Sequence, residues 1–289
     1  IMSKTIKTYP RFTLPQRIEH VVMLLSFTIL GLTGLPQRYP SNGFAASLVS
    51  LLGGVENTRN IHHLAAIALM LVTAYHILVI GYKLYVLRVR ATMLPSFQDA
   101  KDAWQAFTYN LRLTKKPPKM GRYTYEEKVE YWALVWGTVI MGITGFMMWN
   151  PITTTRYFPG EFIPAAKAAH SAEAVLAVLA VLIWHMYSVH IKRFNKAMWT
   201  GDLTEEEMQH EHPLELAEIK AGEGDAEVDQ KTLRKRQMIY FPIAGVLATL
   251  MLAGVYIFVQ SEETAITTYI PKVEESLPVY APQTPTPFP

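Results

Sequence analysis

Five long apolar stretches divide the sequence, and they constrain its fold more than any other feature. They cover about residues 18–37, 61–87, 129–149, 165–191 and 239–259. Each is long enough to cross a hydrocarbon core of ~30 Å at ~1.5 Å per helical residue. A backbone exposed to lipid must satisfy its own hydrogen bonds, so spanning segments of this kind are helical. We therefore expect an all-α integral membrane protein, with a four-helix bundle and a fifth, C-terminal transmembrane helix.

Positively charged residues gather on one side of the expected membrane. Of 27 Lys and Arg residues, 22 lie in the N-terminal tail, at the end of the second stretch and in the loop after it, and between the fourth and fifth stretches. Because cytoplasmic loops carry the excess of Lys and Arg, we expect a cytoplasmic N-terminus and an extracytoplasmic C-terminus, as five crossings also require. Topology thus explains the basic loops, and we expect no nucleic-acid binding.

The absence of cysteine restricts the cofactors that the chain can bind. It excludes disulfides, iron–sulfur clusters ligated by this chain and covalently attached c-type haem. Any metal or haem must then be held mainly by histidine. Glu19 and His20 interrupt the first apolar stretch and no small-residue cleavage site follows it, so we expect a retained helix rather than a signal peptide.

The segments outside the expected membrane are short. We expect a cytoplasmic tail over residues 1–17, the bundle over 18–200 with a cytoplasmic loop at 88–128, a charged cytoplasmic linker over 201–237, the fifth helix over 238–260 and an extracytoplasmic proline-rich tail over 261–289. The linker is acidic from Thr204 to Asp229, which is typical of a solvated segment. Within the loop, Ser96 to Leu111 has apolar residues at helical spacing and predicts a helix on the membrane surface or under a partner subunit.

Histidines occur inside the apolar stretches, where coordinating side chains are costly and by default mark function. His62 and His76 are fourteen residues apart in the second stretch, and His170 and His185 are fifteen apart in the fourth. On a helix these spacings correspond to ~21–23 Å and return to within about 60° of the same face. Both helices run in the same direction, so His62 and His170 share the outer level while His76 and His185 share the inner level. Opposed imidazoles are common axial ligands of haem iron, so the pattern predicts two b-type haems.

A repeated glycine motif supports this interpretation. Residues 31–34 read Gly-Leu-Thr-Gly, residues 142–145 read Gly-Ile-Thr-Gly, and a histidine-bearing helix follows each motif. Small residues let a helix or a flat macrocycle approach the backbone closely. Ordinary helix packing with isolated structural histidines is the alternative, but paired spacings on two parallel helices favour haem.

Several fragments, taken together, form a recognisable set. They are Arg11–His20, Leu32–Leu35, Arg59–His62, Glu126–Trp132, Ala169–His170, Trp184–Tyr187, Thr200–Thr204 and His210–Pro213. This combination, over about residues 10–215, resembles the cytochrome b (gamma) subunit family of membrane-bound formate dehydrogenases and related quinone-linked respiratory oxidoreductases. The resemblance implies an electron-transferring, quinone-reactive subunit rather than a complete enzyme, in the cytoplasmic (inner) membrane of a bacterium or archaeon.

The resemblance also implies the haem ligands. Its pattern makes His62 and His170 the ligands of the outer haem, and His20 and His185 those of the inner haem. The sequence adds His76 at the same inner level. If the internal symmetry decides instead, His76 replaces His20, as in the cytochrome b of cytochrome bc complexes. Both remain candidates, with His20 favoured by the resemblance.

Three arginines lie near the expected haem levels. Arg17 is close to the inner level, and Arg38 and Arg59 are close to the outer level. A guanidinium in such a place can pair with a haem propionate through charge-assisted hydrogen bonds. Each arginine could equally be an interfacial anchor.

The resemblance implies a site for menaquinone or ubiquinone on the cytoplasmic side, close to the inner haem. Quinone turnover moves protons, so titratable groups are expected there, and the candidates are His190, His210, Glu211 and His212. The expected partners are membrane lipid and an extracytoplasmic iron–sulfur or multihaem cytochrome c subunit. Two alternatives remain: a self-contained transmembrane b-type reductase that works without quinone, and a non-redox membrane anchor whose histidines are structural.

Overall fold

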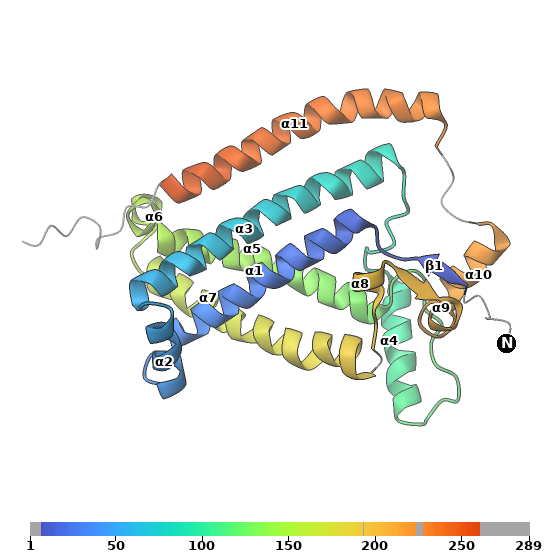
Figure 1. Cartoon of the computed structure of the whole chain (residues 1–289), viewed down its shortest axis with the longest axis horizontal. Helices are drawn as coiled ribbons and strands as arrows, with labels where there is room; N and C mark the ends of the chain where they lie inside the picture. Colours follow the sequence, from blue (N-terminus) through green and yellow to red (C-terminus); the bar gives the residue numbers. More distant parts are fainter. Residues whose placement is uncertain (1–6, 193, 224–227, 261–289) are drawn as a thin grey trace, which may run out of the picture.

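A computed structural model describes residues 7–192, 194–223 and 228–260, and it is almost entirely helical (Figure 1). Its helices are α1 (Leu14–Arg38), α2 (Gly43–Leu51), α3 (Val55–Gly81), α4 (Phe97–Asn110), α5 (Tyr125–Trp149), α6 (Pro151–Tyr157), α7 (Phe162–Leu179), α8 (Ala197–Thr200), α9 (Glu205–Glu211), α10 (Pro213–Ala221) and α11 (Gln230–Gln260). Three π-helical segments continue the long helices, namely η1 (Tyr82–Val86), η2 (Ala180–His185) and η3 (Tyr187–Lys192). Two short strands, β1 (Thr8–Pro10) and β2 (Asp202–Thr204), complete the chain's regular structure within the described residues.

Five helices in the described part of the chain are long and apolar enough to cross a membrane. They are Leu14–Arg38, Val55–Val86, Tyr125–Trp149, Phe162–Lys192 and Gln230–Gln260, so each apolar stretch of the sequence forms a helix. The helices begin before the apolar residues because polar caps start them: Thr13 forms a capping box with Gln16, and Thr124 forms one with Glu127. The expected all-α membrane architecture is confirmed.

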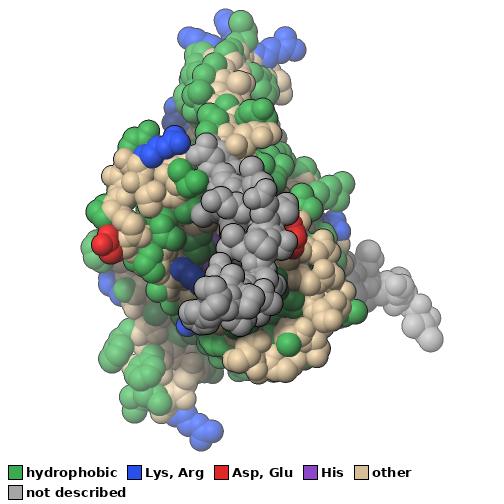
Figure 2. All heavy atoms as spheres, turned by 90° about the vertical axis from the view of Figure 1, so that its left-hand side faces the viewer, with side chains coloured by type: hydrophobic (Ala, Val, Ile, Leu, Met, Phe, Trp, Pro, Cys, Tyr) green, Lys and Arg blue, Asp and Glu red, His purple; other side chains and the backbone are tan. Residues whose placement is uncertain are grey.

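The first four long helices form the bundle, and α11 lies along one side of it (Figure 1). Helix α1 packs on α3 and α5 packs on α7, while α1 and α7 are also in contact. Seen from the end that carries α2 and α6, the periphery consists mostly of hydrophobic side chains and neutral atoms, with only scattered charges (Figure 2). Large apolar side chains such as Leu25, Trp136 and Ile183 are exposed along the spans, as a surface in contact with lipid requires.

Helix α11 is attached to the bundle at both of its ends. Near its start, Tyr240 donates a hydrogen bond to the carbonyl of Leu78, and Gln237 donates one to the hydroxyl of Tyr82 (2.8 Å). Near its end, the Phe258 ring packs edge-on against Trp149, with ring centroids 5.1 Å apart. The fifth helix is therefore packed against α3 and α5 rather than separate from the bundle.

The segment expected to be a solvated linker is folded between Asp202 and Ala221. Strand β2 pairs antiparallel with β1, with Tyr9 opposite Leu203, and helices α9 and α10 follow. A small hydrophobic core forms here from Tyr9, Ala197, Leu203, Met208 and Leu216. We call β1, α8, β2, α9 and α10 the cap, which covers the end of the bundle where α1 begins. Tertiary burial of a few apolar side chains outweighs the acidic composition of the segment.

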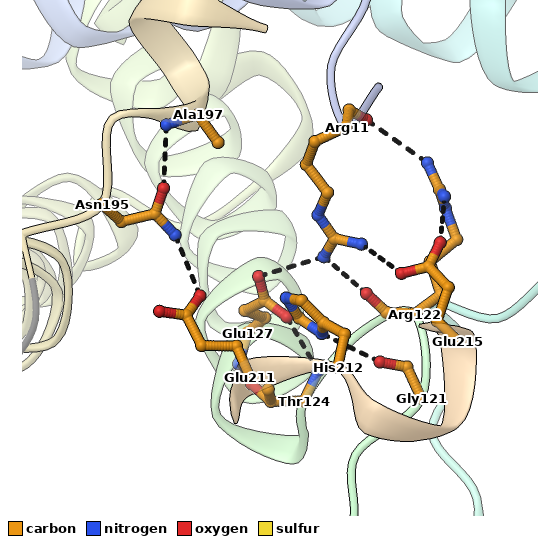
Figure 3. Close-up of polar contacts among 10 residues, drawn as sticks. All are labelled: Arg11, Gly121, Arg122, Thr124, Glu127, Asn195, Ala197, Glu211, His212 and Glu215. Atoms are coloured by element: carbon orange, nitrogen blue, oxygen red, sulfur yellow. Dashed lines mark hydrogen bonds and ion pairs between the residues drawn. The ribbon is translucent and has the colours of Figure 1, made fainter. Parts of the chain in front are cut away.

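Buried charges hold the cap to the start of α5 (Figure 3). Arg11 is 4% exposed and its guanidinium pairs with the carboxylates of Glu215 (2.9 Å) and Glu127 (3.5 Å). Arg122 pairs with the other oxygen of Glu215. A buried charge is tolerated only when it is paired and hydrogen-bonded, so these contacts fix the N-terminal segment, the end of the 88–128 loop and α10 together.

Two expectations about the extramembrane segments remain, the surface helix and the proline-rich tail. The predicted surface helix is α4, and Phe97, Trp104, Phe107 and Leu111 are exposed on it or at its end. Its opposite side faces the protein, because Asp99 binds Lys128 at the start of α5 (2.7 Å). The proline-rich tail expected over residues 261–289 lies outside the described residues.

Topology can be tested with single cysteines, because the sequence contains none. We predict that Lys116→Cys, in the exposed loop after α4, reacts with an impermeant maleimide only in inverted vesicles. Glu161→Cys, in the exposed turn before α7, should react only in right-side-out vesicles. The reverse pattern would refute the expected orientation, and labelling of both from one side would mean that α5 does not cross the membrane.

Candidate functional site

Two histidines face each other at the outer level of the bundle. His62 on α3 and His170 on α7 have ring centroids 6.4 Å apart. Two metal–imidazole bonds of about 2 Å each, extended to the ring centres, would separate coordinating imidazoles by roughly 6 Å. The spacing of this outer pair therefore fits a metal ion held between the two rings.

Threonines on the neighbouring helices orient both outer imidazoles. Thr33 on α1 donates its hydroxyl hydrogen to the carbonyl of Ile29 (2.6 Å), so its oxygen accepts a hydrogen bond from Nδ1 of His62 (2.9 Å). Thr144 on α5 bonds in the same way to the carbonyl four residues before it (2.6 Å) and to Nδ1 of His170 (2.9 Å). Both rings then carry their hydrogen on Nδ1, which leaves the Nε2 lone pair for a metal.

The glycine motifs bring these helices close to the imidazoles. A Cβ atom added at Gly34 would lie 3.1 Å from Cε1 of His62, which is tighter than ordinary contact. At Gly145 it would lie 3.4 Å from Cε1 of His170. The second glycine of each motif therefore lets the helix backbone lie against the ring that its neighbouring threonine holds.

A second pair lies at the inner level. His20 on α1 and His185, at the end of η2, also have ring centroids 6.4 Å apart. The carboxylate of Glu130 on α5 accepts a hydrogen bond from Nδ1 of His185 (2.8 Å). A carboxylate in this position fixes the tautomer and the ring orientation of a metal-binding histidine. The inner pair thus has the same centroid spacing as the outer pair, and a carboxylate rather than a hydroxyl orients one of its two rings, that of His185.

His76 lies at the same level but is engaged elsewhere. Its Nδ1 is hydrogen-bonded to the carboxylate of Glu19, and its Nε2 lies 3.1 Å from the hydroxyl of Tyr131. A carboxylate accepts, so Nδ1 of His76 donates to Glu19, and in the neutral imidazole Nε2 then accepts from Tyr131. Of the two candidates for the inner level, His20 faces His185, whereas His76 contacts Tyr131.

The two halves of the bundle are related by an internal repeat. Thr33 and Thr144, and likewise Glu19 and Glu130, are separated by 111 residues. The histidine spacing is fourteen residues in α3 and fifteen in the fourth span, where the π-helical segment η2 follows α7 and ends at His185. A π-turn accommodates one extra residue within a helix, so His185 keeps the position that His76 has in the other half.

Several residues near the outer pair have other contacts. Arg38 donates to the hydroxyls of Ser171 and Tyr39, the latter at 3.0 Å. Nε of Arg59 is buried without a hydrogen-bond partner. The ring of His63 stacks on Trp149, with centroids 3.6 Å apart. At the inner end, the guanidinium of Arg17 donates to the carbonyls of Met198 and Trp199.

The titratable candidates for quinone chemistry are divided between the cap and its approach. His212 is buried in the cap, where its Nδ1 donates to the carbonyl of Gly121 (2.9 Å; Figure 3). His210 is exposed on α9, and Glu211 accepts from Asn195 (3.3 Å). His190 lies in η3 at the inner end of the fourth span, beside Phe194. The structure does not gather these four side chains into one site.

The groups that orient the histidines were not identified from the sequence as site residues. The glycines of the two motifs stood out, but the threonine beside each one carries the hydrogen bond. Glu19 was noted for interrupting an apolar stretch, and otherwise Glu19, Glu130 and Tyr131 appeared only as members of the matching fragments. Glu130, Tyr131 and Thr144 each lie 111 residues after Glu19, His20 and Thr33, respectively. This common spacing is the signal that could have identified them from the sequence.

Membrane-length helices that hold facing pairs of oriented histidines define a membrane-embedded cytochrome b. Residues 11–201 match the family described as prokaryotic cytochrome b561. The chain belongs to this family, and it is a multi-pass protein of the bacterial inner membrane that takes part in electron transfer with b-type haem.

Two relatives are subunits of formate dehydrogenases from Escherichia coli K12. The cytochrome b556(fdo) subunit is 24% identical over 218 residues, which cover 74% of this chain and 94% of that subunit. The cytochrome b556(Fdn) subunit of the nitrate-inducible formate dehydrogenase is 26% identical over 116 residues, which cover 40% of this chain and 52% of that subunit. The expected membership of the cytochrome b subunit family is confirmed.

The threonine bonds lead to a prediction about haem binding. We expect Thr33→Val to weaken binding at the outer pair about 10–100-fold, because His62 loses the acceptor that fixes its ring. Haem content and the midpoint potential of the purified variant would measure the effect. Thr73→Val is the matched control, since Thr73 lies within the membrane span of α3 and, like Thr33, donates to the carbonyl four residues before it, that of Leu69 (2.8 Å). Equal haem loss in both variants would contradict the orienting role.

The buried histidine of the cap predicts a pH dependence. Burial, reinforced by the charge of Arg11, lowers the pKa of His212 to about 4. In the unfolded chain the pKa is about 6.5, so the unfolded state binds more protons between these values. The cap should have its full stability above pH ~6.5. Its free energy of unfolding should then fall towards pH 4, by up to about 3 kcal/mol.

Limited proteolysis of the cap as a function of pH would test this. His212→Asn should flatten the pH dependence between 4 and 6.5, while His210→Asn, at an exposed position on α9, should leave it unchanged. An unaltered pH dependence in His212→Asn would contradict the assignment.

Proposed function

We propose that the chain is a di-haem cytochrome b subunit that moves electrons between an extracytoplasmic redox partner and the membrane quinone pool. In this proposal His62 and His170 hold the outer b haem, and His20 and His185 hold the inner one. The observation that carries the proposal is the equal 6.4 Å spacing of the two histidine pairs at two levels of one bundle. When bound, each haem would supply a one-electron redox centre.

The chain's own residues would prepare each histidine for this role. Thr33 and Thr144 hold the hydrogen of the outer imidazoles on Nδ1, and Glu130 does so for His185. Each bond keeps Nε2 free and limits rotation of the ring. A carboxylate also increases the basicity of the imidazole, so the pair that includes His185 should have the lower reduction potential of the two.

Arginines near the outer level are candidates for the propionates. The buried Nε of Arg59 has no hydrogen-bond partner, and a propionate oxygen would supply one. Arg38 is exposed and holds Ser171, the residue after His170. Arg17 is committed to backbone carbonyls of α8, which favours a role in holding the cap over one at a propionate.

The proposal of a quinone and of a redox partner rests on the absence of cysteine from the chain and on the names of its relatives. Without cysteine the chain cannot ligate an iron–sulfur cluster, so a substrate-oxidising centre would belong to another subunit. Relatives named as formate dehydrogenase subunits favour an extracytoplasmic iron–sulfur partner, with a multihaem cytochrome c as the alternative. Menaquinone or ubiquinone would exchange electrons at the inner level, beside His20 and His185.

Haem stoichiometry tests the ligand assignment. We predict two b haems per chain by pyridine haemochrome, one in His20→Ala and two in His76→Ala. A chain purified without b-type haem would refute the proposal and leave a membrane anchor. Two haems with no oxidation of them by added quinone would favour the self-contained reductase.

A further inference from the structure

The inner level of the bundle contains two half-sites of nearly the same construction. In one, Glu130 holds His185 and His185 faces His20. In the other, Glu19 holds His76 and His76 faces Tyr131. We call Tyr131 and His76 the mirror pair. Tyr131 lies 111 residues after His20, so it occupies the position that His20 has in the first half.

The two half-sites also agree in distance. The rings of the mirror pair have centroids 5.8 Å apart, compared with 6.4 Å for His20 and His185. In both, a carboxylate fixes the hydrogen of the facing histidine on Nδ1. The one difference in residue type is the tyrosine, whose hydroxyl lies 3.1 Å from Nε2 of His76. That nitrogen is the one through which His76 would otherwise bind iron.

We propose that the identity of residue 131 decides where the inner haem binds, and that the mirror pair is a second haem half-site that Tyr131 keeps closed. The hydroxyl of Tyr131 donates to Nε2 of His76 and occupies its lone pair, so His76 takes no part in ligation. The proposal rests on the di-haem function proposed above, and it assigns His76 a hydrogen-bonding role that links α3 to α1 and α5.

This assignment explains why His76, although it lies inside the membrane, would not be a ligand of haem iron. The outer pair joins equivalent positions of the two halves, His62 and His170, so it is symmetric with respect to the repeat. The inner pair joins non-equivalent positions, and the repeat therefore generates it twice. Only one of the two copies has histidine on both sides, which limits the inner level to one haem.

The test exchanges the ligand from one half-site to the other. In His20→Ala we expect one haem per chain, because Tyr131 continues to block His76. Adding Tyr131→His to that variant should restore the second haem, now between residue 131 and His76. Adding Tyr131→Phe instead should leave one haem, because it frees His76 without supplying a second ligand.

Haem stoichiometry, low-spin electron paramagnetic resonance and redox titration provide readouts other than activity. The restored haem should be low-spin, with a midpoint potential different from that of the native inner haem. His20→Ala with Tyr75→His is the matched control, since it adds a histidine next to His76 on a different face of α3 and should remain at one haem.

The outcomes separate this inference from the proposed function. Wild-type protein without haem would refute the proposed function itself. Two haems in wild type but only one in the His20→Ala, Tyr131→His variant, with the outer haem retained as proof of folding, would overturn the mirror site. Two haems in His20→Ala alone would also overturn it, because His76 would then bind iron despite Tyr131.

Discussion

An imidazole can bind a metal only through the nitrogen that carries no hydrogen, and in this bundle polar side chains fix which nitrogen that is for His62, His170 and His185. Water cannot do so inside a bilayer, so His62, His170 and His185 depend on side chains of neighbouring helices. Thr33, Thr144 and Glu130 supply these partners, and the packing of α1 on α3 and of α5 on α7 brings them into place. The helix contacts that hold the bundle together therefore also orient the metal-binding imidazoles.

Much of the architecture could be predicted because the bilayer imposes simple rules. Length and hydropathy located all five spans, and helical spacing placed histidines at two levels. Spacing could not decide between His20 and His76, since it gives depth along a helix and not which neighbour occupies a nitrogen. For Nε2 of His76 that neighbour is Tyr131, a residue on another helix. The fifteen-residue spacing in α7 likewise depends on a π-helical segment that the sequence pattern does not reveal.

The cap was the least predictable part of the fold. Its core joins Tyr9 to Leu203, Met208 and Leu216, which are about two hundred residues away in sequence. Each contributing segment is short and largely polar, so composition alone indicates a solvated linker. β1 can pair with β2, and Arg11 can be buried between two glutamates, only once the folded bundle has brought the N-terminal segment close to the segment that follows the fourth span.

The π-helical segment η2 shows how such a bundle tolerates a change in length. Inserting one residue into an α-helix would rotate everything after it by about 100° and advance it by about 1.5 Å, which would turn a ligand away from its site. The wider turn between Ala180 and His185 absorbs the insertion locally. A comparison of the two helices anchored on His62 and His170 therefore needs a gap within this turn, and without that gap it would match His76 with Trp184 instead of His185.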